Sequence, residues 1–168
     1  GDDVKVGFTY VLKRAFSNPV IITLMVAEFC TGFVRQGLML WFTPFLKEIH
    51  HIAPGSGLHQ VASLGITVGG IAGGLICGYA SDRLFQSRRP PVAFIFYIGQ
   101  IISLLILGAA RVPGLAAFMI GFCCMWIFGV HGMLSGTASM DFGGTRGAAT
   151  VTGLLDGVQY LASGLTGF

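Results

Sequence analysis

One arginine stands inside a long apolar run of the sequence. The run covers residues 29–46 and reads FCTGFVRQGLMLWFTPFL, with Arg35 near its middle. In a helix over residues 20–45, at about 1.5 Å per residue, Arg35 lies ~15 Å or more from either end. Burying arginine in mid-membrane costs at least about 2.5 kcal/mol, so the side chain should face a cavity or a partner. Two explanations remain open: an ion pair that serves packing, or a cation that faces a ligand.

Two acidic residues and a histidine lie in similarly apolar surroundings. Glu28 precedes Arg35 by seven residues, which places it about 20° away around a helix but roughly 10 Å along it. Direct contact is therefore not expected, although a charge on the same face still interacts with Arg35. Asp156 is either a packing partner or a functional charge. A lone buried histidine such as His131 is more often an interhelical hydrogen-bond partner than a ligand or a proton relay.

Membrane-spanning helices are the elements that must position these side chains. Of the 168 residues, 54% are hydrophobic and 10% are charged, against about 25% charged in a soluble domain. A transmembrane β-barrel would show short alternating segments instead. The sequence therefore predicts an all-α membrane protein. A spanning helix needs about 20 mostly apolar residues, and five segments qualify: roughly 19–46, 59–80, 91–110, 115–138 and 148–168.

The connections between these segments carry many basic residues on one side of the membrane and few on the other. The positive-inside rule places the richer side in the cytoplasm. We therefore predict a cytoplasmic segment at residues 1–18 and one transmembrane bundle at 19–168, with the loop at 47–58 outside. Because the chain does not begin with Met and stops inside an apolar run, we expect it to be part of a longer polypeptide. The richer side carries Lys5, Lys13, Arg14, Arg83, Arg88, Arg89 and Arg146, and the other side carries Lys47 and Arg111.

The loop GYASDRLFQSRRPP, residues 78–91, combines both signs of charge. Basic residues there are explained by anchoring at the membrane surface. That does not explain an acidic residue placed against them. We expect a charge network between helix ends that involves Asp82, Arg83, Arg88 and Arg89.

Glycines in the second and fifth segments recur at short spacing along one helical strip. Small residues there allow a neighbouring backbone to approach closely, so tight helix packing is expected. A further possibility is that these glycine-lined helix faces slide along a neighbouring helix during a conformational change. The glycines are Gly65, Gly69, Gly70, Gly73, Gly74 and Gly78 in the second segment, and Gly153, Gly157, Gly164 and Gly167 in the fifth.

No constellation typical of an enzyme or a metal site occurs in the sequence. The four cysteines (Cys30, Cys77, Cys123 and Cys124) lie in apolar stretches without metal-ligand spacing, and are expected to be small apolar residues. No Ser/His or Cys/His arrangement stands out. Neither an enzymatic activity nor a cofactor is expected. The net charge of +3 is explained by topology, so no nucleic-acid partner is expected.

Several of these stretches together resemble a known family. Gly78, Asp82 and Arg83, followed by Arg88 and Arg89, resemble the cytoplasmic-loop signature of the major facilitator superfamily. FVRQGLMLWFTPFLKEIHHI (33–52) is similar to the seventh helix of its organophosphate:phosphate antiporters. SMDFGGTRGAATVTGLLDGVQYLASG (139–164) resembles their junction between the tenth and eleventh helices. The resemblance implies that the chain holds helices 7–11, a fragment of the C-terminal six-helix bundle.

The resemblance implies a secondary transporter that exchanges phosphorylated organic solutes, such as glycerol phosphate or sugar phosphate, for inorganic phosphate by alternating access. Arg35 would bind the phosphate, with Gln36, His131 and Tyr160 as further substrate-binding candidates. A planar guanidinium fits two phosphate oxygens at once. The implied partners are the lipid bilayer and the N-terminal half of the same transporter. The implied location is a bacterial inner membrane.

The sequence also departs from the family pattern. Leu40 and Thr67 stand where glycerol-phosphate transporters carry acidic residues, and His131 stands where a proline is common. Glu28 and Asp156 are candidates to replace the missing gating charges. Two other functions remain open: a transporter-like sensor of sugar phosphate, and a superfamily transporter of another organic anion.

Overall fold

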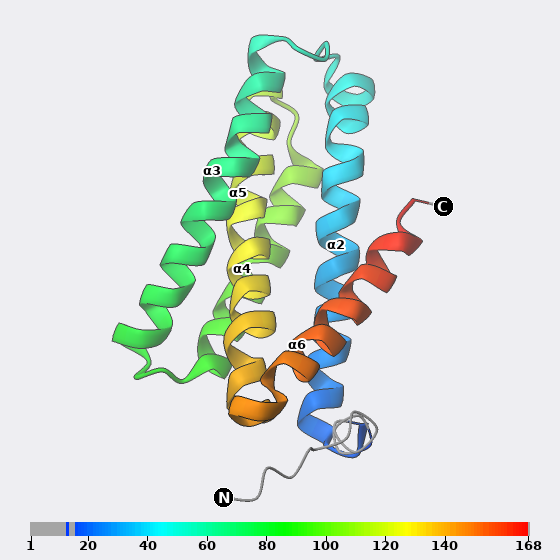
Figure 1. Ribbon diagram of the computed structural model, residues 1–168. Helices are drawn as coiled ribbons and strands as arrows, with labels where there is room; N and C mark the ends of the chain where they lie inside the picture. Colours follow the sequence, from blue (N-terminus) through cyan, green and yellow to red (C-terminus); the bar gives the residue numbers. More distant parts are fainter. Residues whose placement is uncertain (1–12, 14–15, 168) are drawn as a thin grey trace, which may run out of the picture.

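The computed structural model describes residue 13 and residues 16–167, with side chains described outside 136–148. This part of the chain is helical with short connections: α2 (Pro19–His50), α3 (Gly57–Tyr79), a π-helical turn (Ala80–Leu84), α4 (Arg89–Ala109), α5 (Pro113–His131), a second π-helical segment (Gly132–Ala138) and α6 (Ser139–Leu165). Figure 1 shows α2, α3 and α5 running the length of the bundle, while α6 crosses α2 obliquely. The predicted all-α membrane class is confirmed.

Four helical stretches in the described residues are long and apolar enough to cross a membrane: Pro19–His50, Gly57–Leu84, Arg89–Ala109 and Pro113–Ser135. They correspond to the first four predicted segments. The fifth predicted segment, 148–168, overlaps α6 as far as Leu165, and α6 is not among the four. Membrane crossing by residues 148–168 therefore stays a prediction.

Local sequence explains where the first helix begins and ends. Asn18 accepts a hydrogen bond at its Oδ1 from the backbone N–H of Val20 (2.9 Å), and Pro19 occupies the first turn. The helix ends where His51 adopts a left-handed conformation with φ of 53°. This end lies four residues beyond the predicted boundary at 46. The helix is therefore long enough to place Arg35 close to its midpoint.

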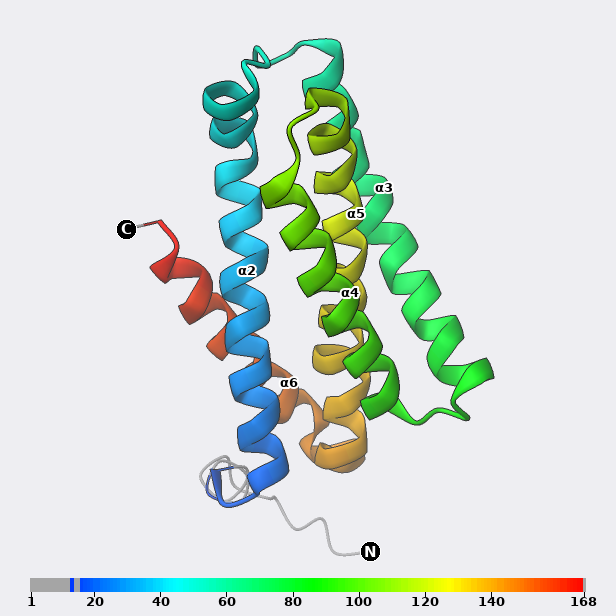
Figure 2. The ribbon, with the colours of Figure 1, turned by 180° about the vertical axis from the view of Figure 1, so that it is seen from behind.

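The connection between α5 and α6 differs from the prediction. A turn was expected at residues 139–147, but the backbone there already belongs to α6, which begins at Ser139. The π-helical segment Gly132–Ala138 extends α5 towards the end of the bundle, and α6 then runs back across α2 (Figure 2). A continuous helix lets the backbone groups of this segment pair with one another, which favours helix even through glycine-containing sequence.

One strip of glycines explains how α3 packs against α5. A Cβ atom added to Gly69 or Gly73 would collide with the backbone carbonyl of Gly121 or Met125, respectively. Gly65 lies against Gly121 in the same seam. The expected close approach is therefore confirmed for this strip. The remaining glycines of α3 differ: a Cβ at Gly70 would lie 3.3 Å from the Phe128 ring, and one at Gly74 or Gly78 would meet nothing within 4 Å among the described atoms.

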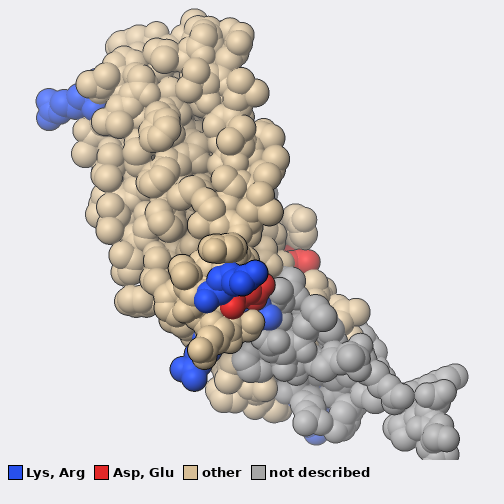
Figure 3. Space-filling view, turned by 90° about the vertical axis from the view of Figure 1, so that its left-hand side faces the viewer, with Lys and Arg blue, Asp and Glu red and all other residues tan. Residues whose placement is uncertain are grey.

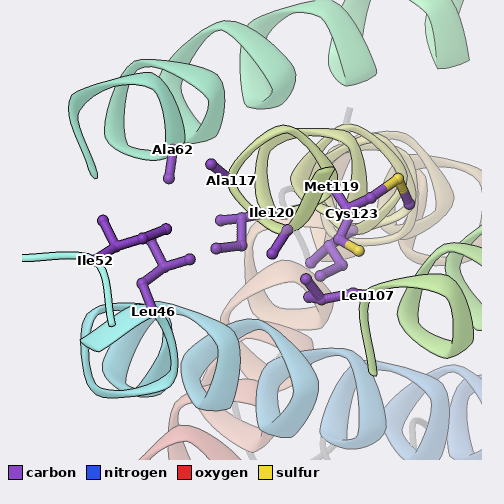
Figure 4. Packing of buried hydrophobic residues seen from close by; sticks show 10 residues of the cluster. Leu46, Ile52, Ala62, Leu107, Ala117, Met119, Ile120 and Cys123 are labelled. Atoms are coloured by element: carbon purple, nitrogen blue, oxygen red, sulfur yellow. The ribbon is translucent and has the colours of Figure 1, made fainter. Parts of the chain in front are cut away.

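The core lies around α5, the most enclosed helix of the described bundle. Figure 4 shows side chains of α2, α3, α4, α5 and the loop after α2 converging near that loop: Leu46, Ile52, Ala62, Leu107, Ala117, Met119, Ile120 and Cys123. Large apolar side chains on the periphery are exposed instead, including Leu75 (70%), Leu105 (68%) and Phe94 (67%). Exposed apolar surface of this extent fits lipid contact.

Candidate functional site

The candidate site is built where α2 and α6 cross. The crossing is tight because Gly32 has no side chain: a Cβ there would lie 2.5 Å from both the Cγ and the carbonyl oxygen of Gln159. Ser163, one turn further along α6, donates a hydrogen bond from Oγ to the Gly32 carbonyl (3.4 Å). The small residue thus fixes which side chains of the two helices meet.

Arg35 on α2 and Tyr160 on α6 face each other near this crossing. The guanidinium carbon of Arg35 is 5.8 Å from the centroid of the Tyr160 ring, within the range of a cation–π contact. Arg35 is half-buried, whereas Tyr160 is 66% exposed. The Nε of Arg35 is buried and has no hydrogen-bond partner among the described residues. The pair therefore presents a cation whose N–H donors remain available for a ligand.

Gln36 follows Arg35 on α2 and is half-buried. Within the described part of the chain, no hydrogen bond links it to Arg35, Tyr160 or His131. Its role in substrate binding therefore stays a prediction. The roles of Arg35, His131 and Tyr160 in substrate binding also stay predictions.

Glu28 lies deeper in the same region, between three helices. Its side chain has no exposed surface, and its Oε2 is 3.5 Å from Nδ1 of His131 at the end of α5. The same Nδ1 lies 2.8 Å from Nε2 of Gln159, which is also fully buried. Glu28, His131 and Gln159 thus tie α2, α5 and α6 together. The sequence singled out Glu28 and His131 separately but gave no sign that they meet.

Asp156 lies on α6 one turn before Gln159 and Tyr160. It is half-buried, and its Oδ1 is buried without a hydrogen-bond partner among the described residues. The charges of Asp156 and Arg35 both act on Glu28. No ion pair between Arg35 and either acid occurs in the described part of the chain. The expectation that Glu28 and Arg35 do not touch directly agrees with this arrangement.

Thr31 and Tyr97 belong to the same region but were missed by sequence reasoning. Thr31 is fully buried, and its Oγ1 lies 2.8 Å from the Tyr97 hydroxyl on α4 and donates to the Ala27 carbonyl (2.8 Å). A signal existed for Thr31, which stands three residues after Glu28 and four before Arg35 on one helical face. No local pattern points to Tyr97, because its role depends on how α4 packs.

The charged loop at residues 78–91 lies at the opposite end of the bundle from the buried cluster that includes Leu46. Ser87 donates a hydrogen bond to Oδ1 of Asp82 (3.2 Å), and Asp82 and Arg89 both line a cavity of about 350 Å³ between α3, α4 and α5. Arg83 and Arg88 are exposed. Figure 3 shows basic and acidic side chains gathered near this end, with an uncharged surface across the middle of the molecule. The predicted charge network stays a prediction, although its members lie within one small region.

No group of three or more potential metal ligands occurs among the described residues. All four cysteines are free thiols, with Cys30 exposed and the others buried. The described site is therefore one of buried charges and hydrogen-bonding groups. Such groups are suited to holding a polar ligand.

Comparison with known proteins gives several relatives. The chain is 30% identical over 164 residues to the glycerol-3-phosphate transporter of Bacillus subtilis, covering 92% of the chain and 34% of that protein. It is 28% identical to a probable hexose phosphate transport protein of Chlamydia pneumoniae (96% and 34%). It is 27% identical to the membrane sensor protein UhpC of Escherichia coli (93% and 35%). The chain thus spans about a third of the length of these relatives.

No solved structure shows significant similarity to the chain. A family description covers nearly all of it, however, since residues 3–167 match the Major Facilitator Superfamily. The four apolar helical stretches agree with that match, and both identify an integral membrane protein. The chain belongs to the Major Facilitator Superfamily.

Proposed function

We propose that the chain forms part of a transporter that exchanges phosphorylated organic solutes for inorganic phosphate, with Arg35 as the phosphate ligand. The observation that carries the proposal is a half-buried guanidinium near the midpoint of a spanning helix. Its Nε has no hydrogen-bond partner among the described residues. A charge held in that position without a complete set of partners indicates a ligand.

The geometry around Arg35 suits a phosphate group. A guanidinium presents its N–H donors in one plane, and two of them match two phosphate oxygens. The Tyr160 ring centroid lies 5.8 Å from the guanidinium carbon, and this cation–π contact takes no hydrogen bond from Arg35. Gln36 and His131 are further proposed contacts of the substrate. The remainder of the ligand would be held by the rest of the protein.

Exchange follows if two anions share one binding group. An organic phosphate and inorganic phosphate would compete for Arg35, so the site would release one before it accepts the other. The site would lie between the two halves of the protein, near the bilayer midplane, and open alternately to each side. The names of two relatives support this class, because one is a glycerol-3-phosphate transporter and the other a probable hexose phosphate transport protein.

Conformational change would involve the charges at the cytoplasmic end. Asp82, Arg83, Arg88 and Arg89 lie around the ends of α3 and α4, far from Arg35 along the helices. Charge contacts there would hold one orientation of the bundle and release in the other. Glu28 and Asp156 would supply further charge contacts inside the bundle. Because the three relatives reported above are bacterial, the proposed location is a bacterial inner (plasma) membrane.

A second function is favoured by one relative, the membrane sensor protein UhpC. A sensor would bind the same phosphorylated ligand but transmit a signal instead of moving it. Reconstitution of the full-length protein in liposomes loaded with labelled phosphate separates the two functions. External glycerol phosphate or hexose phosphate should drive loss of label. Ligand binding without any loss of label would favour the sensor.

A further inference from the structure

A groove of about 860 Å³ separates α2 from α4 at the end of the bundle that carries the charged loop. It runs from Pro19 to Ala27 on α2 and from Arg89 to Tyr97 on α4, which is ~12 Å along each helix. Figure 2 shows these two helices alongside each other. Most of the wall is apolar and comes from side chains of both helices and of the segment after α5, including Leu24, Ala93, Phe94 and Leu134.

The deep end of the groove is closed by a contact between its two helices. The hydroxyl of Tyr97, which lines the groove, lies 2.8 Å from Oγ1 of Thr31. A groove that ends ~12 Å below the membrane surface follows most of one leaflet, whose hydrocarbon is ~15 Å thick. A spanning helix would have to continue through about 30 Å. The length of the groove therefore fits an acyl chain better than a further spanning helix.

The wall of the groove offers little to a polar ligand below its mouth. Thr23 lines it, but its hydroxyl donates a hydrogen bond to the Pro19 carbonyl (2.9 Å) and is already satisfied. Phe94 and Val20 are 67% and 43% exposed at its edges. Exposed apolar surface beside an apolar groove fits contact with the hydrocarbon of a lipid.

The mouth of the groove is basic. Arg88 lines it, is exposed, and makes no ion pair with any residue that the structure describes. Its backbone is fixed at the start of α4, where its N–H donates to the Phe85 carbonyl (2.8 Å). Arg89 lines the mouth as well, and the described lining includes no acidic side chain. A cation above an apolar groove is complementary to a molecule with an anionic head and an apolar tail.

We propose that this groove binds an anionic phospholipid, with the headgroup phosphate at Arg88 and one acyl chain lying along the groove as far as Tyr97. In the predicted orientation the lipid belongs to the cytoplasmic leaflet, which is the negatively charged one. The bound lipid touches both α2 and α4, and a ligand of the folded state stabilises that state by mass action. The proposal depends on membrane insertion and not on which solute is transported.

Thermal melting of the purified full-length protein in detergent tests the headgroup contact. Dioleoylphosphatidylglycerol is added at rising mole fraction, and dioleoylphosphatidylcholine, which has the same chains and no net charge, is the comparison. The anionic lipid should raise the melting temperature more. In Arg88→Gln the mole fraction that gives half of this gain should be about fivefold higher. Arg83→Gln is the matched control, because Arg83 is exposed in the same loop but does not line the groove, and it should match the wild type.

The place of the acyl chain is tested by Ala93→Phe, which fills the groove and keeps Arg88. Its melting temperature should respond little to the anionic lipid. Leu105→Phe, at an exposed position of α4 outside the groove, should respond as the wild type does. A full response in folded Ala93→Phe would overturn the placement of the chain. If Ala93→Phe does not fold, Arg88→Gln, a change at an exposed side chain, still decides the proposal.

Three further outcomes would overturn the site. Equal gains from the two lipids in the wild type would remove the anionic headgroup and leave the groove to a protein segment. Equal weakening in Arg88→Gln and Arg83→Gln would mean that general charge attraction explains the gain. Inorganic phosphate in place of lipid should shift the wild type and Arg88→Gln equally, whereas a shift that needs Arg88 would assign this arginine to free phosphate.

Discussion

Gly32 of α2 lies directly against Gln159 of α6, so closely that a Cβ on Gly32 would overlap the side chain and the carbonyl of Gln159. This contact sets the distance between the two helices that carry Arg35 and Tyr160. It also holds Gln159 against His131. One small residue therefore determines the geometry of a site whose chemistry belongs to other residues.

Replacing Gly32 with alanine should force α2 and α6 apart. Overpacking of this kind costs about 1–3 kcal/mol, which outweighs the gain in helix propensity of under ~1 kcal/mol. Gly37→Ala is the matched control on the same helix, because a Cβ there meets nothing within 4 Å. Thermal melting of the purified variants should show a lower midpoint for Gly32→Ala alone. Similar midpoints for both variants would mean that the crossing is looser than described.

Removing the Tyr97 hydroxyl should weaken the packing of α4 against α2. Tyr97→Phe loses the 2.8 Å hydrogen bond to Thr31, worth about 1 kcal/mol. The loss is limited because Thr31 keeps its bond to the Ala27 carbonyl. Tyr79→Phe, at an exposed position on α3, should leave the melting temperature unchanged. A larger effect at position 79 than at 97 would contradict the assigned contact.

The orientation in the membrane can be tested with introduced cysteines. In a Cys30→Ala background, which removes the exposed native thiol, Ser87→Cys should be labelled from the cytoplasm and Ala53→Cys from outside. The expectation rests on seven basic residues on the predicted cytoplasmic side and two on the other. The measurement is labelling by a membrane-impermeant reagent in intact cells and in inverted vesicles. Labelling of both positions from one side would refute the predicted topology.

Much of the fold follows from sequence because apolar runs of about 20 residues have few alternatives in lipid. Pro19 marks the first helix start correctly, although Pro91 lies two residues inside α4, which begins at Arg89. The site was less predictable. Arg35 stands out by its charge alone, whereas its neighbour Tyr160 depends on where two helices cross.

The contact between Glu28 and His131 could not be read from their positions in the sequence. It requires three helices to meet at one depth, which is set by long-range packing. The turn at 139–147 was wrong for a different reason. Glycine lowers helix propensity, but a continuous helix keeps the backbone groups of this segment hydrogen-bonded to one another. Local patterns therefore predicted which segments form helices better than which residues touch.

The charge of Asp82 should matter for the transport cycle more than for binding. Asp82→Asn keeps an oxygen that can accept the hydrogen bond from Ser87 and removes only the charge. Exchange in liposomes should slow, while the dissociation constant for phosphate changes little. Ser87→Ala, which removes the hydrogen bond and keeps the charge, should exchange at a rate closer to that of the wild type. A dissociation constant weakened as much as the exchange rate would place Asp82 in the binding process instead.

Whether Arg35 binds phosphate can be decided by measuring phosphate affinity and thermal stability together. The full-length wild type would be compared with Arg35→Lys, which keeps the charge but loses the planar fork, and with Arg35→Ala. Losing one charge-assisted hydrogen bond costs about 1.5–3 kcal/mol, so the lysine variant should bind phosphate roughly tenfold to a hundredfold more weakly. The alanine variant should show no binding and an unchanged or raised melting temperature. Unchanged phosphate binding together with a lower melting temperature in Arg35→Ala would contradict the account, because that result belongs to a packing charge.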